Sequence, residues 1–474
     1  MARPSEPARP ETTDDYDHVR DNPDRKPKLS SSLIMYAQLT LRVAVFTVAL
    51  PTSLGYTEKI GGSKGIAGLM VGLVPISAAI FGWPGLWLME AIGIKKSQIV
   101  ANAFTAVGCA MYSMCYCWNS VGLILVARFI QGIGIQGYSY QFFSRAAGIN
   151  CRSKYFMMMG GCIGVGYGVG PLLGALMIAA FNHVDADEHK ILNKYTAPGW
   201  LMAFIYVSII FATWFLFEDP LLETAEVKAR EEKEFRQNMS PEEKTIRKEK
   251  RRLEQEAKGP RFTRSELFGL VMNLVIFAFY PILISSLEIY TISVANKTWN
   301  MSMEKIGLYM AGVMLATVPI SLAAGSAFQK WQLEDRKAIL IFFTVSVGAS
   351  VFFFDFLPDE NHAISDVALW TIGCLIWICS YQICISAGTA LITKQVPTEC
   401  KVHFNVLMGS VLLFSRGAGS FIGTLFCYDE HDVHQYEGLS PNSVFAIFMT
   451  VASTVLLVVF IAAYPYLKQK RNTT

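Results

Sequence analysis

Four ionisable side chains stand inside long apolar stretches of this 474-residue sequence: Arg42, Arg128, Glu288 and Arg416. A charge in membrane hydrocarbon costs about 3 kcal/mol or more, so each of them should face water, an opposite charge or a ligand. The planar guanidinium of Arg42 could clamp an anion, and pairing with backbone carbonyls is the equal alternative. The same two interpretations apply to Arg416.

Glu288 could carry a proton, because burial and a neighbouring arginine change a carboxylate's proton affinity in opposite directions. Protonation in one conformation and release in another would couple a proton gradient to the movement of a solute. A fixed salt bridge between two halves of the protein is the alternative. The sequence shows no pairing of a nucleophile with a base and no phosphate-binding loop, so we do not expect an enzyme.

Two glycine motifs lie in neighbouring apolar stretches. The first runs Arg128-Phe-Ile-Gln131-Gly132-Ile-Gly134, and the second runs Gly166-x-x-x-Gly170-Pro171-x-x-Gly174. Glycines four residues apart give a helix a smooth face that a second helix can approach closely. Pro171 removes a backbone donor, which predicts an interruption or bend in the helix. A face that slides or rocks is one interpretation, and plain close packing has the same geometry.

The composition is that of a polytopic membrane protein, with 52% apolar and only 17% charged residues. About 20 apolar residues cross a bilayer as a helix that satisfies its own backbone hydrogen bonds. Nucleic-acid binding is disfavoured, and the ten cysteines show no metal-ligand spacing, so we expect neither a metal nor a cofactor. We expect twelve apolar spans, near residues 31–55, 65–90, 98–118, 121–146, 155–181, 197–217, 266–292, 305–327, 338–357, 365–393, 404–427 and 441–465.

The spans fall into two groups of six around one long hydrophilic stretch. Lys and Arg gather in the short loops on the side of the two termini, which predicts that both termini are cytosolic. Two glycosylation sequons, at Asn296 and Asn300, follow the seventh span on the predicted lumenal side. The predicted organisation is a disordered cytosolic tail, a six-helix bundle, a charged cytosolic linker, a second six-helix bundle and a short cytosolic tail, at residues 1–30, 31–217, 218–265, 266–467 and 468–474.

The first glycine motif resembles the fourth-helix motif of the major facilitator superfamily, and the second resembles its fifth-helix motif, which is usually associated with antiport. The loop Glu90-x-x-Gly93-x-Lys95 is similar to the superfamily's gating loop in a degenerate form. The resemblance implies an all-α fold of twelve transmembrane helices in two pseudo-symmetric six-helix bundles. It also implies for Arg128 the role of an arginine assigned to proton coupling, with helix packing as the alternative.

In the fold that this resemblance implies, spans one, four, seven and ten line a central cavity. Polar groups on these spans are therefore the candidates for contact with a substrate. Glu288 and Arg128 are the candidates for proton coupling. The candidate substrate contacts are Gln38, Arg42, Gln131, Tyr138, Gln141, Ser285, Tyr381 and Gln382.

Three short segments resemble one branch of the superfamily, that of SPX-domain vacuolar phosphate transporters and lysosomal ceroid-lipofuscinosis-type facilitators: Thr196-Ala-Pro198-Gly199-Trp200, Phe217-Glu218-Asp219-Pro220 and Leu333-Glu334-Asp335-Arg336-Lys337. The branch implies a lysosomal or vacuolar membrane and an inorganic anion such as phosphate or chloride. The short stretch before the first span leaves no room for an SPX domain. The pair Gln141-Phe142 stands where the phosphate carriers have a basic pair, so phosphate is not the default substrate.

The sequence thus predicts a secondary active transporter that moves a small solute, an anion, across an endomembrane by alternating access, with proton coupling or exchange. An anion channel on the same scaffold and a sensor without transport are the alternatives, and the plasma membrane stays open as a location. The expected partners are the solute and the lipid bilayer, and a monomer is expected. The segment from Tyr16 to Val19 matches a tyrosine-based signal for sorting adaptors.

Overall fold

The computed structural model describes residues 26–147, 149–186, 188–219, 264–330, 334–354, 363–396, 401–427 and 440–467. All regular elements within these ranges are helices. Eleven of the described helices or helix pairs are long and apolar enough to cross a membrane, and α4 (Lys64–Ile80) is a shorter apolar helix that the start of α5 continues. The predicted all-α fold with twelve spans is therefore confirmed. The tail that contains Tyr16 and most of the linker lie outside the described residues.

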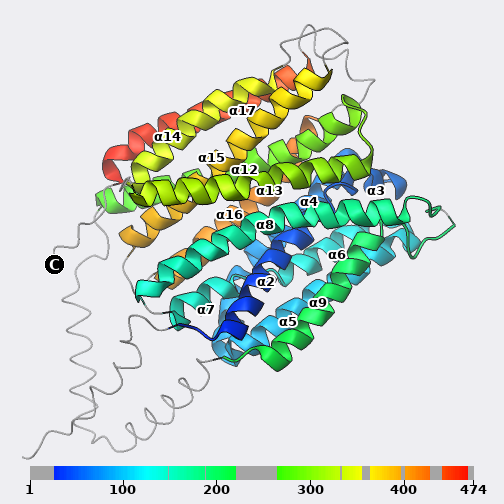
Figure 1. Cartoon of the computed structure of the whole chain (residues 1–474), viewed down its shortest axis with the longest axis horizontal. Helices are drawn as coiled ribbons and strands as arrows, with labels where there is room; N and C mark the ends of the chain where they lie inside the picture. The colour runs from blue at the N-terminus through cyan, green and yellow to red at the C-terminus, as the bar shows by residue number, and fades with distance from the viewer. Residues whose placement is uncertain are drawn as a thin grey trace, which may run out of the picture.

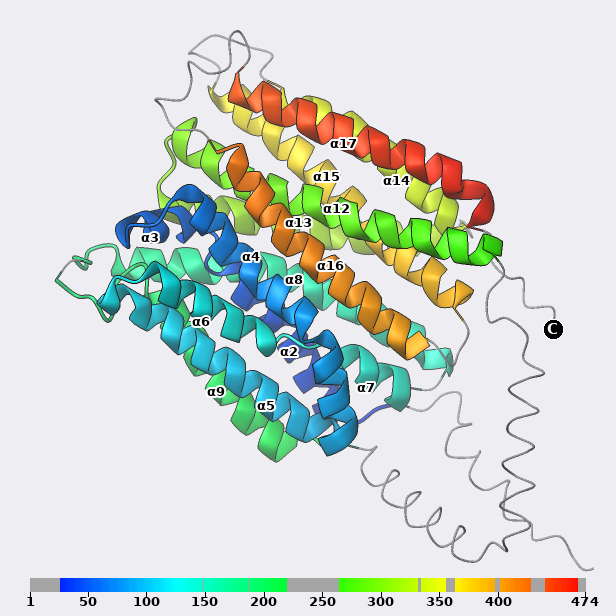
Figure 2. The same cartoon turned by 180° about the vertical axis from the view of Figure 1, so that it is seen from behind.

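Two groups of helices lie side by side, and the chain passes from one to the other once (Figures 1 and 2). The N-terminal half contains α2 (Leu29–Thr47), α3 (Ser53–Lys59), α4, α5 (Gly82–Trp118), α6 (Val121–Ile133), α7 (Tyr138–Ala146), α8 (Ile149–Phe181) and α9 (Ala197–Leu216). The C-terminal half contains α12 (Arg264–Lys297), α13 (Met303–Lys330), α14 (Asp335–Ala349), η1 (Ser350–Phe353), α15 (Ala363–Gln395), α16 (Lys401–Leu425), α17 (Pro441–Ala463) and η4 (Tyr464–Tyr466).

Two of the spans are broken in the middle. The first span stops as α2 at Thr47 and resumes as α3, and the fourth span is split into α6 and α7 by residues 134–137. Each break leaves backbone carbonyls at a helix end without a helical donor. Such groups are tolerated at membrane depth only where the protein itself supplies their partners.

The second glycine motif packs α8 closely against α2. A Cβ atom on Gly166 would lie 2.6 Å from the carbonyl oxygen of Thr40, and one on Gly174 would lie 2.5 Å from that of Val48. α8 nevertheless continues through Pro171, so the predicted interruption is wrong. A single lost backbone hydrogen bond is tolerated in a transmembrane helix whose neighbours pack closely around it.

The opposite face of α8 contacts the other half of the protein. Gly164 lies against Val318 of α13, and Gly307 of α13 lies against Pro171. α16 has the corresponding position in the C-terminal half, because Gly417 packs on Gly72 of α4. The most extensive contacts between the halves are therefore made by α8 with α13 and by α16 with α4.

The start of α2 and the end of α17 lie at the same end of the molecule, and the connection from α12 to α13 lies at the other (Figures 1 and 2). Asn296 lies in the last turn of α12 and Asn300 in that connection, and both side chains are exposed. This arrangement fits the predicted orientation. Which end faces the cytosol, the glycosylation of the two asparagines, and the bundle boundaries stay predictions.

The predicted gating loop is a turn inside α5. Gly93 has φ 84° and ψ 168°, a backbone conformation that only glycine adopts without strain. The helix restarts directly afterwards, and one carboxylate oxygen of Asp219 accepts hydrogen bonds from the backbone N–H groups of Ile94 and Lys95 at 2.8 and 3.3 Å. Asp219 thus caps the third span, while Glu90 on the other side of the turn is exposed.

The residue before Asp219 fastens the sixth span to the first. Glu218 pairs with Lys28, and its backbone N–H donates to the hydroxyl of Ser31 at 3.1 Å. Glu218 and Asp219 therefore hold the gating turn and the start of α2 together at one end of the N-terminal half.

The positive φ at Gly93 predicts a clear loss of stability for Gly93→Ala. A side chain in this conformation costs about 1–3 kcal/mol, so the midpoint of thermal unfolding in detergent should fall by several degrees. Gly312→Ala is the matched control, because a Cβ atom at Gly312 meets nothing within 4 Å and the residue is helical. An equal effect of the two substitutions would contradict the role of the turn.

Candidate functional site

Arg416 and Glu288 form a buried ion pair between two helices of the C-terminal half. Nη2 of Arg416 lies 2.6 Å from Oε1 and 2.7 Å from Oε2 of Glu288. The two side chains are 3% and 4% exposed. Such short, charge-assisted contacts are among the strongest hydrogen bonds in proteins. The pair joins α16 to α12, so it does not bridge the two halves.

Small residues on α16 bring these two charges within reach of one another. A Cβ atom on Gly423 would lie 2.8 Å from the backbone of Ser286 on α12. The hydroxyl of Ser286 in turn donates to the carbonyl of Gly419 at 2.9 Å. The two helices can therefore approach closely, and the Arg416 side chain spans the remaining distance to Glu288.

Aromatic rings from both halves surround the guanidinium of Arg416. Its Cζ atom lies 4.5 Å from the ring centre of Tyr167 on α8 and 5.6 Å from that of Phe46 on α2. Tyr381 on α15 is 5.9 Å away. Cations are attracted to aromatic faces within about 6 Å. The ion pair thus belongs to the C-terminal half, but the N-terminal half forms part of its surroundings.

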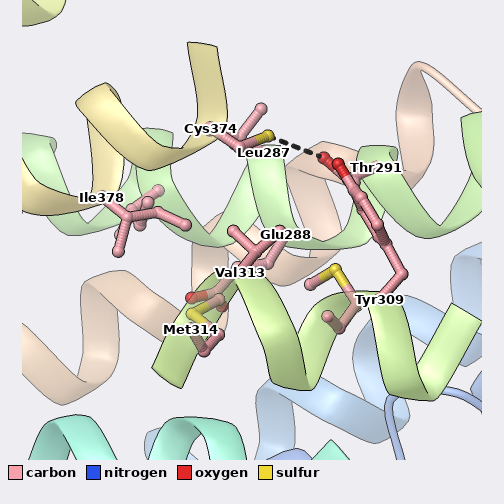
Figure 3. A pocket seen from close by; sticks show the side chains of 10 residues that line it. Leu287, Glu288, Thr291, Tyr309, Val313, Met314, Cys374 and Ile378 are labelled. Carbon is pink, nitrogen blue, oxygen red and sulfur yellow. Dashed lines mark hydrogen bonds between the residues drawn. The ribbon is translucent and has the colours of Figure 1, made fainter. Parts of the chain in front are cut away.

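A small cavity lies beside Glu288 between α12, α13 and α15 (Figure 3). Its volume is about 10 Å³, close to the minimum for one water molecule. Its lining is apolar apart from Glu288 and a group at one end, where Thr291 meets Cys374 and Tyr309. The carboxylate of Glu288 points away from Thr291 (Figure 3), toward the side where Arg416 binds it.

Arg128 is held almost entirely by backbone carbonyls. Its Nε donates to Met70 of α4 at 3.0 Å, and Nη1 and Nη2 donate to the carbonyls of Val45 and Phe46 at 3.4 and 3.3 Å. The latter two lie in the last turn of α2, where helical donors are missing. Nη1 also donates to Gln131 at 2.8 Å. Arg128 therefore satisfies the backbone carbonyls at the break in the first span. This is a structural role in helix packing, which is the alternative to proton coupling for this residue.

Arg42 lies inside the N-terminal half, against the break between α6 and α7. It is 4% exposed, its Nη1 donates to the carbonyl of Gln136, and its Cζ lies 5.7 Å from the ring centre of Tyr138. Nε and Nη2 have no hydrogen-bond partner among the described residues. One turn earlier, Gln38 donates to Thr213 of α9 at 2.8 Å.

The predicted substrate contacts fall into separate groups rather than one cavity. Gln38, Arg42 and Tyr138 gather inside the N-terminal half, and Gln131 joins Arg128 and also donates to Cys109 at 3.0 Å. Tyr381 lies beside the ion pair. The remaining three are Gln382, which donates to Thr317 at 3.1 Å, and the buried Gln141 and Ser285.

The sequence analysis missed Tyr167 and Phe46 as neighbours of the ion pair. Tyr167 stands between Gly166 and Gly170, and a large ring inside a small-residue motif is a signal that could have been used. Phe46 lies in the last turn of α2, just before the break, and no sequence pattern marks that position.

Comparison with known proteins defines the family. The model of the Major Facilitator Superfamily matches residues 32–424, so the chain belongs to this superfamily. An MFS-type transporter of Schizosaccharomyces pombe is 30% identical over 215 residues, which are 43% of this chain and 45% of that protein. An SPX domain-containing membrane protein of Oryza sativa subsp. indica is 22% identical over 209 residues, or 44% of this chain and 28% of that protein.

A solved structure shows the same fold. The crystal structure of a D-xylose-proton symporter matches 90% of this chain and 96% of its own, with 12% identity and a TM-score of 0.64. The predicted resemblance to the superfamily and to its SPX-domain members is confirmed, and the chain is a multi-pass membrane protein of a transporter family rather than an enzyme. Its matches span 45% and 60% of the length of two curated relatives in Schizosaccharomyces pombe.

The buried ion pair predicts a distinct pattern of stabilities. Glu288→Leu or Arg416→Met alone should lower the free energy of unfolding by about 3–5 kcal/mol, because each leaves one charge buried without its partner. The double variant should recover most of that loss, since apolar groups replace both charges. Thermal unfolding in detergent compares the stability of the wild type, the two single variants and the double variant. A double variant whose loss equals the sum of the two single losses would show that the pair is not coupled.

Proposed function

We propose that this protein is a secondary transporter that moves a small anion by alternating access, with Glu288 carrying a coupled proton. The observation that carries the anion assignment is the imbalance of buried charge. Among the described residues, the buried charged side chains are three arginines and one glutamate. An interior with excess positive charge favours a negatively charged solute.

The ion pair supplies a mechanism for coupling. With Glu288 deprotonated, Arg416 is neutralised by contacts of 2.6 and 2.7 Å. Protonation of Glu288 removes that negative charge and leaves a buried guanidinium whose Nε has no partner among the described residues. An anion then replaces the carboxylate as the counter-ion, so proton and anion occupy the site together.

The surroundings of Arg416 link this exchange of counter-ions to movement. Tyr167 and Phe46 belong to the N-terminal half, while Glu288 and Tyr381 belong to the C-terminal half. If the halves rock about the contacts of α8 with α13 and of α16 with α4, Arg416 keeps Glu288 and changes its aromatic neighbours. The site is then exposed to one side of the membrane at a time, as alternating access requires.

Exchange is the second mode that this site supports. When Glu288 stays protonated, one anion can leave and another can enter without any net movement of protons. The resemblance to the SPX-domain branch supports a lysosomal or vacuolar membrane as the location, with the acidic lumen as the source of protons and Asn296 and Asn300 as glycosylated lumenal sites. The plasma membrane is the alternative location.

The test is uptake into proteoliposomes that contain the purified full-length protein, using labelled phosphate, chloride and a small carboxylate as probes. Glu288→Gln should abolish uptake driven by a pH gradient and leave exchange within about twofold of wild type, because Gln cannot cycle a proton. Glu58→Gln, which removes an exposed carboxylate on α3, is the matched control and should leave both modes unchanged. Uptake by the Glu288→Gln protein with an unaltered pH dependence would contradict the role of Glu288.

The same assay separates a carrier from a channel and from a sensor. Uptake that saturates, with counterflow of the anion, supports the carrier. Large currents that do not saturate would identify a channel, and binding without any flux would identify a sensor. Either of these results would overturn the proposed alternating access.

A further inference from the structure

Arg42 keeps one complete edge of its guanidinium without a partner. Nη1, on one edge, is occupied by the carbonyl of Gln136. Nε and Nη2 share the other edge, and neither has a hydrogen-bond partner among the described residues. This edge is the fork with which arginine binds the two oxygens of an oxyanion side by side. The residue is 96% buried, so bulk water does not supply the missing partners.

The charge of Arg42 is also uncompensated. The buried Arg416 has Glu288, and each nitrogen of the Arg128 guanidinium donates to a carbonyl or amide oxygen. Arg42 has one carbonyl and the ring of Tyr138, and no described carboxylate forms an ion pair with it. An unpaired buried charge costs several kcal/mol, which an anion in contact with it would offset.

Other buried polar groups without partners among the described residues stand on α5 and α9, which share a hydrophobic core cluster with α2. Among the described residues, neither amide atom of Asn102 on α5 has a partner, and the hydroxyl of Tyr206 on α9 has none. Tyr206 is close enough to Arg42 for an electrostatic interaction. Asn102 follows Ala101 on α5. Ala101 and Thr105 pack on Gly134, the first residue of the break between α6 and α7. Arg42 contacts the same break. Each buried polar group of this kind lowers the stability of the fold by about 1–3 kcal/mol when no partner binds it.

Two further acceptors complete the set. Oε1 of Gln38, one turn before Arg42 on the same face of α2, has no partner in the described part of the chain. The same holds for Oε1 of Gln98, one turn before Asn102. The amide nitrogens of both residues are already used, by Thr213 and by the sulfur of Met35. These two amide groups are thus oriented, and each leaves its oxygen to accept a hydrogen bond.

We infer that Arg42, Asn102 and Tyr206 form a buried binding site for a small oxyanion that itself carries a hydroxyl group, such as hydrogen phosphate or bicarbonate. The donors are the Arg42 fork, the Asn102 amide and the Tyr206 hydroxyl, and they bind the anion's oxygens. Gln38 and Gln98 accept from the anion's hydroxyl. Chloride and sulfate have no hydroxyl to donate and would leave these two acceptors without partners.

This site is distinct from the Arg416 and Glu288 pair, because its members come from α2, α5 and α9 of the N-terminal half. It goes beyond the proposed function, and binding to it is measured without transport. Loss of proton-driven uptake in Glu288→Gln therefore tests one site, and loss of anion binding in Arg42 variants tests the other.

The experiment measures the thermal unfolding midpoint of the full-length protein in detergent as each sodium salt is titrated at constant ionic strength. Phosphate or bicarbonate should raise the midpoint along a saturable curve, since a ligand of the folded state stabilises it by mass action. Sulfate and chloride should not. No shift with any salt, or an equal shift with all four, would overturn the site.

Two variants make the test specific. Arg42→Lys keeps the charge and loses the fork, so anion binding should weaken about tenfold or more. Asn102→Asp adds a carboxylate to the inferred site as a counter-ion for Arg42, so it should raise the midpoint in the absence of anion and abolish the response to anion. Unchanged affinity in Arg42→Lys, or a full response in Asn102→Asp, would contradict the inference.

Asn273→Asp is the matched control. Asn273 on α12 is also buried with both amide atoms unpaired among the described residues, but it lies beside Phe277 and Gly388 rather than an arginine. This substitution should lower the midpoint and leave the response to anion intact. Loss of the response here as well would show that the effect of Asn102→Asp is general and would overturn the assignment.

Discussion

A charge buried in a bilayer must be compensated inside the protein, and the interior of this membrane protein is arranged around that constraint. The described residues bury three arginines, and each meets the constraint differently. Arg128 is satisfied by carbonyls that a break in the first span exposes. Arg416 is satisfied by a carboxylate, so its compensation depends on a proton. Arg42 is only half satisfied. In our account, these three solutions correspond to structural support, coupling and anion binding.

Close helix contact is the second requirement, because these charges reach their partners only where backbones approach one another. α8 and α16 carry small residues on two faces, so each contacts a helix of its own half and a helix of the other half. Relative movement of the halves would therefore occur along the contacts of α8 with α13 and of α16 with α4. Arg416 extends from one of these helices and Tyr167 from the other, which places the ion pair where such movement changes its surroundings most.

The spans and the buried charges could be predicted from the sequence, because hydrophobic length and the cost of a charge in hydrocarbon act locally. The partners of the charges could not. Gln38 and Arg42 share a helix face, as their spacing predicts, yet spacing does not say which neighbour that face meets. The partner of Glu288 depends on how closely α16 approaches α12, which is a tertiary property of Gly423 and Ser286. The uninterrupted α8 is likewise a tertiary property, since α2 and α13 pack closely against the helix on either side of Pro171.

The central claim is that the anion replaces Glu288 as the counter-ion of Arg416 when that carboxylate is protonated. The most direct measurement is the number of protons taken up from a weakly buffered solution when the transported anion binds to the purified protein. Linkage predicts an uptake of about one proton per anion bound to Arg42→Lys, in which the second inferred site is weakened, near neutral pH, and none when Glu288→Gln is added. Binding of that anion to Arg42→Lys without proton uptake would contradict the account.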